Sequence, residues 1–172
     1  FLNGEFSSQL STMKSFAANY VVAAGAIDQL HLLYLHSANS GKESVARQIV
    51  ISENANASIT ETHINLDDGK FSSRAQSAFV VKAGAKLQLQ RLCRLGDSGD
   101  LMNEATVQAY RDTSVTLTQL TLGGGIVRNN TVAELLDTGA SATLLGLSLG
   151  KGKQHIDNTT FVHHKVGHTE SQ

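Results

Sequence analysis

The stretch Val115-Thr116-Leu117-Thr118-Gln119-Leu120-Thr121-Leu122, followed by three glycines at 123–125, decides the fold. Apolar and polar side chains alternate along it with period two, which is typical of a β-strand with one buried face. Residues 58–66 and 86–92 show the same alternation. Helical periodicity is weak throughout the chain, so the sequence predicts an all-β fold.

Turns divide the chain at regular intervals. Glycines that mark one kind of turn are spaced by 28, 27, 27 and 27 residues: Gly41, Gly69, Gly96, Gly123 and Gly150. A second small-residue turn lies about midway in each unit, at 56–57, 84–85, 113–114 and 139–140. Self-similarity at a fixed period is the signature of a repeat architecture. Each unit therefore consists of two extended runs and two turns.

The runs that lie between the clearest strands are looser, but they fit the same plan. They cover residues 45–52, 75–81, 104–110, 130–135 and 156–162, and the segment 16–35, split near 24–26, counts as one more unit. A unit of this size cannot bury its own apolar face, so neighbouring units have to stack. We predict a parallel β-helix (solenoid) with about 27 residues and two strands per turn, and with the glycines at the corners.

We expect a single domain over residues 1–172, with a lead-in strand at 1–14 and stacked repeats at 15–172. Phe1 is not an initiator residue, and the next glycine corner is due near position 177. The chain is therefore expected to be the core fragment of a longer protein, and its last unit is expected to be incomplete.

Composition excludes several classes of protein. The chain carries 14 Lys and Arg against 15 Asp and Glu, without a basic stripe of the kind that nucleic acid needs. Its longest apolar runs are far shorter than the ~20 residues of a membrane span. Cys93 has no partner for a disulfide bond. We expect a cytoplasmic protein that binds neither nucleic acid nor membranes.

Residues 135–141 match the signature of aspartic proteases, in which two Asp carboxylates share a proton. The repeat explains the same residues more simply, because Asp137 falls in a mid-unit turn. The second candidate, Asp97, precedes it by too few residues for a two-lobed enzyme. We therefore predict no catalytic residue and no enzymatic activity.

Histidines gather near the end of the chain, at His155, His163, His164 and His168. Neither a zinc-protease motif nor a cysteine-containing zinc finger is present. His155 and His164 are the weak candidates for a metal ligand. The histidines at 31, 36 and 63 are expected at the surface or in hydrogen bonds.

Cys93 follows Leu92 in a predicted strand, where a lone cysteine is usually a small buried hydrophobe. The neighbouring Arg91 and Arg94 leave open the alternative of a reactive thiolate.

Paired carboxylates at Asp67–Asp68 and at Asp97 and Asp100 suggest a second class, a carbohydrate-active or carbohydrate-binding β-helix. Such a protein would carry exposed aromatic side chains beside its acids, whereas this chain has six Phe and three Tyr that do not line up along one sheet. Solvated turns explain these carboxylates better.

The runs Gly124-Gly125-Ile126-Val127-Arg128-Asn129-Asn130 and Gln154-His155-Ile156-Asp157-Asn158-Thr159-Thr160, followed by His164 and Ser171, resemble the core of the SufB/SufD family of iron–sulfur cluster assembly proteins, with the likeness closer to SufD. The opening run Phe1-Leu2-Asn3-Gly4-Glu5-Phe6 is similar to the segment that leads into that core. The resemblance implies a right-handed parallel β-helix of two sheets.

The resemblance also implies a function. It is that of a non-catalytic scaffold subunit that pairs with a SufB-like subunit and a SufC-like ATPase, with a homodimer as a further possibility, and in which the complex handles the cluster. Relatives usually have Cys where Thr169 stands and often His at Thr159, so no metal or cofactor ligand is carried over to these positions.

Overall fold

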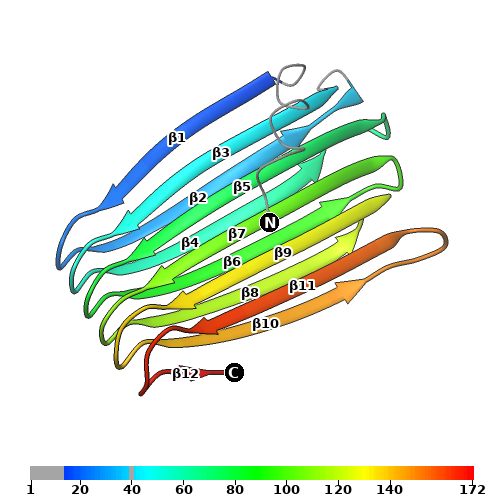
Figure 1. Cartoon of the computed structure of the whole chain (residues 1–172). Helices are drawn as coiled ribbons and strands as arrows, with labels where there is room; N and C mark the ends of the chain where they lie inside the picture. The colour runs from blue at the N-terminus through cyan, green and yellow to red at the C-terminus, as the bar shows by residue number, and fades with distance from the viewer. Residues whose placement is uncertain (1–13, 39–40) are drawn as a thin grey trace.

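The computed structural model describes residues 14–38 and 41–172, and these form two sheets of parallel strands (Figure 1). The odd sheet contains, in spatial order, β1 (Lys14–Val22), β3 (Lys42–Ile51), β5 (Phe71–Val81), β7 (Gly99–Ala109), β9 (Ile126–Leu135) and β11 (His155–His164). The even sheet contains β2 (Ile27–His36), β4 (Asn56–Asn65), β6 (Lys86–Leu95), β8 (Ser114–Gly123), β10 (Ser141–Leu149) and β12 (Glu170–Ser171). Each strand pairs with the strand two places along the chain, which confirms the predicted parallel β-helix with two strands per turn.

The coils are slightly longer than predicted. There are about five of them, at about 29 residues each. Asp100 pairs with Ile126, 26 residues later, whereas Lys42 pairs with Ser72, 30 residues later. The predicted length of 27 residues was counted between glycines at the same kind of turn, but these glycines are not paired with one another in the register of the sheets. The segment 16–35 does form one more unit, since Gly25 turns β1 into β2. Residues 1–13, most of the expected lead-in strand, lie outside the described residues.

The turn from each odd strand to the next even strand contains one residue with positive φ. These residues follow one another from coil to coil: Gly25, Asn54, Gly84, Asp112, Gly139 and His168. The backbone N–H of each of the first five donates to the next coil, as from Gly25 to the Glu53 carbonyl at 2.9 Å. Glycine, Asn and Asp tolerate this left-handed conformation best. The ladder fixes how successive coils superpose.

Glycine is also needed for space at this turn. A Cβ on Gly84 would collide with the side chain of Asn54, and one on Gly139 with that of Asp112. The column therefore alternates between glycine and a side chain that covers the glycine of the next coil.

The interior between the sheets has an apolar half, which lies next to this turn. Its fully buried members come from both sheets: Val22, Ile49, Ile51, Ile59, Phe79, Val81, Leu87, Leu89, Val107 and Leu135. A smaller apolar cluster closes the opposite, glycine-corner end: Phe71, Cys93, Leu95, Leu101 and Val127. Within residues 14–38 and 41–172, no helix is long and apolar enough to cross a membrane.

Candidate functional site

Between the two apolar clusters lies a layer of buried polar side chains, which we call the polar belt: Arg47, Glu61, His63, Arg91 and Asn103. They come from β3, β4, β6 and β7, so the belt crosses three successive coils. Each is at most 8% exposed. Charged residues are almost never buried to this extent unless they are paired. The belt is therefore the most unusual feature of the interior.

Glu61 lies between two guanidinium groups. Its Oε1 accepts from Arg47 Nε at 3.1 Å and its Oε2 from Arg91 Nε at 2.9 Å. Ser77 Oγ donates to Oε1 at 3.1 Å. Burial acts to raise the pKa of Glu61, but the charges of Arg91 and Arg47 outweigh it, so the pKa lies below its usual value. Glu61 is thus ionised, and it joins the coil of β3 and β4 to the coil of β5 and β6.

Four aromatic rings stack next to this ion cluster. Ring centroids are 4.3 Å apart for Tyr34 and His63, 5.4 Å for His63 and His36, and 4.5 Å for His36 and Phe71. The Arg47 guanidinium covers the outer face of the Tyr34 ring at 4.6 Å. His36 Nε2 and His63 Nδ1 share a hydrogen bond of 3.1 Å.

Burial lowers the pKa of both imidazoles, of His63 most strongly, so both are neutral near pH 7. The expectation of hydrogen bonds for these histidines is confirmed, but a surface position is wrong for His36 and His63, which are 2% and 1% exposed.

The belt exists because the apolar pattern of the even strands changes face halfway along. In β8, Val115 and Leu117 point inward, but the next apolar residue is Leu120, three positions on, and it points outward. Gln119 and Thr121 therefore occupy inward positions. The same change in β6 places Arg91 inside and Leu92 outside. The spacing of three between Leu117 and Leu120, and between Leu89 and Leu92, is the sequence signal for the belt, which strict alternation does not predict.

The change of face has a second result on the outer surface of the even sheet. Outward leucines recur along the solenoid axis on β2, β6, β8 and β10, and we call them the leucine row: Leu33, Leu35, Leu92, Leu120, Leu122, Leu147 and Leu149. Thr62 and Ile64 of β4 and Arg94 of β6 interrupt the row between β2 and β8. The leucines on β2 and β10 are about half exposed or more.

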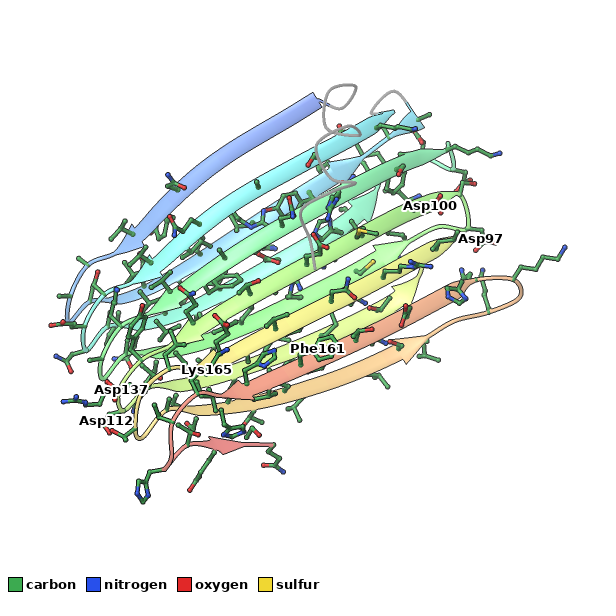
Figure 2. The ribbon with its side chains drawn as sticks, viewed as in Figure 1. Asp97, Asp100, Asp112, Asp137, Phe161 and Lys165 are labelled. Carbon is green, nitrogen blue, oxygen red and sulfur yellow. The ribbon has the colours of Figure 1, made fainter. Side chains whose placement is uncertain are left out.

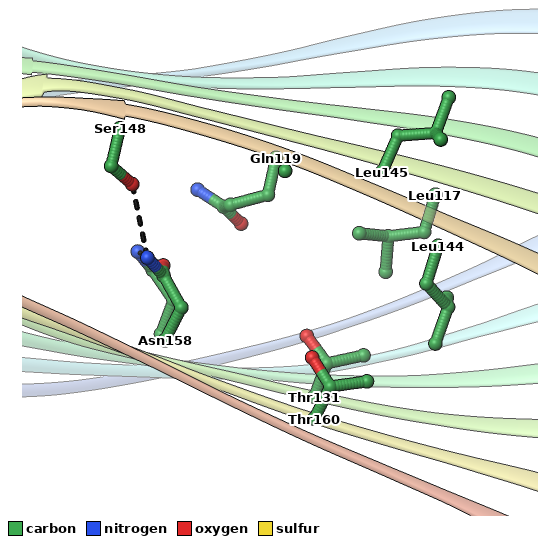
Figure 3. Close-up of a pocket in the computed structure, with 10 residues that line it drawn as sticks. Leu117, Gln119, Thr131, Leu144, Leu145, Ser148, Asn158 and Thr160 are labelled. Atoms are coloured by element: carbon green, nitrogen blue, oxygen red, sulfur yellow. Dashed lines mark hydrogen bonds between the residues drawn. The ribbon is translucent and has the colours of Figure 1, made fainter.

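A cavity of about 270 Å³ lies between the inner faces of the last coils (Figure 3). Its polar wall contains Gln119, Asn129, Ser148 and Asn158. Asn129 Nδ2 donates to Asn158 Oδ1 at 2.9 Å, and Asn158 Nδ2 donates to Ser148 Oγ at 3.0 Å. Asn129 is in register with Asn103, so the cavity continues the polar belt toward β11.

The two histidines proposed as metal ligands lie at opposite ends of β11. A ten-residue strand spans roughly 30 Å, so His155 and His164 cannot share one ion. Both ring nitrogens of His164 have hydroxyl partners, Thr169 Oγ1 at 2.6 Å and Ser171 Oγ at 3.0 Å. The described part of the chain contains no group of three His, Cys, Asp or Glu side chains arranged to hold a metal ion.

Cys93 is fully buried beside His63. Burial raises the pKa of its thiol to about 12, against the weaker opposite effect of Arg91. It is therefore a neutral core residue, and the alternative of a reactive thiolate is wrong because desolvation outweighs the neighbouring positive charge.

The acidic residues singled out in the sequence lie at or next to turns, and Figure 2 shows Asp97 and Asp100 on one edge of the sheets and Asp137 on the opposite edge. Asp137 pairs with Arg111 at 3.4 Å at one end, and Asp97 lies at the other. Asp100 Oδ1 accepts from the backbone N–H of Ile126, and Asp67 accepts from that of Gly69. These carboxylates hold turns, and the two protease candidates are not brought together.

The aromatic side chains do not form a carbohydrate platform in the described residues. Tyr34, Phe71 and Phe79 lie inside, while Tyr20 and Phe161 are exposed on different strands of the odd sheet.

A comparison with protein families identifies the architecture. Residues 33–172 match the family described as "SUF system FeS cluster assembly, SufBD core domain". The chain belongs to the SufBD core family. No curated protein and no solved structure matches it. Family membership places the chain in iron–sulfur cluster assembly by the SUF system, without distinguishing SufB from SufD.

The residues that first suggested this family have structural roles in this SufBD core. Gln154 Nε2 donates to Asp97 Oδ1 at 2.6 Å, which joins two glycine corners. A Cβ on Gly125 would meet the carbonyl oxygen of Asp97 at 2.6 Å. Asn129 and Asn158 form the amide ladder of the cavity. These residues of the signature block therefore contribute to the packing of successive coils.

Proposed function

We propose that this SufBD core is part of a non-catalytic scaffold subunit, closest to SufD, in a cytoplasmic SUF complex with a SufB-like subunit and a SufC-like ATPase. The observation that carries the proposal is the family match over residues 33–172. The order of the resemblance along the chain, from residues 124–130 to His164 and Ser171, supports the same family. The cluster is cargo of the complex, and no ligand residue is assigned to it here.

The leucine row supports a role within a complex. Contiguous exposed apolar surface is uncommon on monomeric proteins and marks places where partners bind. Leu147 and Leu149 are 59% and 62% exposed on one strand, next to Leu120 and Leu122 in the register of the sheet. We place a contact with the SufB-like subunit on this row.

Co-purification tests the proposal. A tagged form of the full-length protein, expressed with the SufB-like and SufC-like subunits of the same cell, is expected to recover both in fixed ratio. Recovery of neither subunit would contradict the scaffold assignment.

A matched pair of variants tests the surface. The double variant Leu147→Glu, Leu149→Glu is expected to lower recovery of the SufB-like subunit at least tenfold. Thr118→Glu, which adds a charge to an exposed position of the same sheet outside the leucine row, is expected to leave recovery unchanged. Equal recovery with both variants would remove the contact from this row.

A further inference from the structure

The charges of the polar belt do not cancel. Among the described residues, Glu61 is the only buried carboxylate, whereas Arg47 and Arg91 are two buried guanidinium groups. Arginine stays protonated in proteins, so the cluster carries one excess positive charge. The neighbouring Cys93 thiol, with a pKa of about 12, supplies no negative charge. A buried charge without a counter-charge is strongly destabilising.

The excess charge belongs mainly to Arg91. Arg47 Nε donates to Glu61 Oε1 at 3.1 Å, and its Nη2 lies 3.0 Å from the same oxygen as an ion pair without hydrogen-bond geometry. Arg91 Nε donates to Glu61 Oε2, and Arg91 Nη2 donates to Asn103 Oδ1. Arg91 Nη1 has no hydrogen-bond partner in the protein. The side chain of Arg91 is 1% exposed, so bulk water does not solvate that N–H group.

Asn103 adds a second unpartnered donor at the same place. Its Oδ1 accepts from Arg91, so its Nδ2 has to face away as a donor, and no protein acceptor meets it. Asn129 Oδ1, one coil further on and also unpartnered, is the nearest acceptor by register. Asn129 Oδ1 can pair Asn103 Nδ2, and Gln119 Oε1, which is also unpartnered and in register with Arg91, can pair Arg91 Nη1. Neither amide carries a charge, so the excess positive charge stays without a counter-charge.

We propose that the polar belt holds a monovalent anion of halide size, bound by Arg91 Nη1 with Asn103 Nδ2 as the second donor. Buried N–H groups beside an uncompensated positive charge select an anion, because charge-assisted hydrogen bonds satisfy both at once. The layer is closed by side chains of Ala75, Ser77 and Ala105, each at most 4% exposed, so the ligand has to be small.

The cavity of Figure 3 lies next to this site along the solenoid. Gln119, in its wall, pairs in register with Arg91, and Asn129 pairs with Asn103. The polar side chains of the cavity therefore lie one coil from the two donors.

Thermal unfolding of the full chain at constant ionic strength tests the site. Sodium chloride and sodium bromide are compared with sodium gluconate, whose anion is too large to enter. Binding to the folded state alone raises Tm in a saturable way, and a rise of about 3 °C or more is expected in either halide. Equal Tm values in halide and gluconate would overturn the proposal.

Asn103→Asp supplies a permanent carboxylate beside Arg91. Its Tm in gluconate is expected to reach that of the wild type in chloride, and its dependence on halide is expected to vanish. Asn130→Asp makes the same change on the outer face of β9 and is expected to keep the dependence. A halide dependence in Asn103→Asp equal to that of the wild type would contradict the site.

Bromide also gives a direct readout that does not depend on a variant folding. Anomalous diffraction from wild-type crystals in sodium bromide is expected to show a peak within hydrogen-bond distance of Arg91 Nη1. Bromide peaks confined to the protein surface would overturn the proposal.

Discussion

The apolar half of the interior and the polar belt are built by the same strands. In β6, Leu87 and Leu89 enter the apolar half, and two positions later Arg91 enters the belt. The first half is stabilised by removal of apolar surface from water, which depends on each side chain separately. The belt depends on the ion pairs of Glu61 with Arg47 of its own coil and Arg91 of the next coil. The comparison shows that one regular backbone can hold two interiors whose stability has different physical origins.

The largest effect is expected from Glu61→Gln. The change removes the negative charge that Arg47 and Arg91 share, and it is expected to lower the free energy of unfolding by about 3–5 kcal/mol. Urea unfolding followed by circular dichroism measures it. Glu104→Gln is the control, since Glu104 pairs with Arg74 near the surface and is expected to cost only about 1 kcal/mol. Similar losses in both variants would mean that burial does not distinguish these ion pairs.

A comparable but separate effect is expected in the apolar half. Leu89→Ala leaves a cavity in a closed core and is expected to cost about 3 kcal/mol. Leu92, three positions later on the outer face of the same strand, is the matched control, and Leu92→Ala is expected to cost less than about 1 kcal/mol. Urea unfolding of the two variants measures both losses of free energy. Equal losses in Leu89→Ala and Leu92→Ala would contradict the change of face in β6.

The strands and turns could be predicted because their signals are local. The alternation in residues 86–92 and 115–122 correctly predicted β6 and β8. The glycines at 96 and 123 correctly predicted the turns that follow these strands. The repeat length was less accurate because it was counted between corner glycines that are not in register from one coil to the next. A residue type alone does not identify positions that are in register.

The polar belt could not be predicted by the same reasoning. Arg91 and Glu61 are charged, and a charged residue in a half-buried strand is normally assigned to the solvent face. Side chains of a strand alternate between its two faces, so Arg91 lies on the same face as the inward Leu87 and Leu89 of β6. Glu61 lies on the same face as the inward Ile59 of β4. Glu61 and Arg91 meet because the register between β4 and β6 places them opposite each other, and the sequence of one strand alone does not determine that register.

The turn ladder beside the apolar half gives a smaller expected effect. Gly139→Ala places a Cβ in a left-handed residue and against Asp112, so it is expected to cost more than about 2 kcal/mol. Gly25→Ala meets the backbone strain but no neighbouring atom and is expected to cost about 1 kcal/mol. Thermal unfolding of both proteins measures the difference. A Gly25→Ala loss as large as that of Gly139→Ala would show that space plays no part.

The smallest expected effect is the pH dependence that the belt adds. His36 and His63 bind protons less readily when folded than when unfolded, because burial lowers the pKa of both. The unfolded chain therefore binds more protons as pH falls below about 6.5, and stability declines with falling pH in that range. His63→Phe keeps a ring in the stack and is expected to flatten this slope. His155→Gln, an exposed change, is the control, and equal slopes in His63→Phe and the wild type would contradict the assignment.

The most direct test of the divided interior replaces the whole ion cluster at once. The triple variant Arg47→Met, Glu61→Leu, Arg91→Met removes every charge of the belt and fills similar volume, so its free energy of unfolding is expected to lie within about 1 kcal/mol of the wild type or above it. Glu61→Gln alone is expected to lose most of its stability under the same conditions. A triple variant as unstable as the single one would contradict the view that the belt is held by mutual charge pairing.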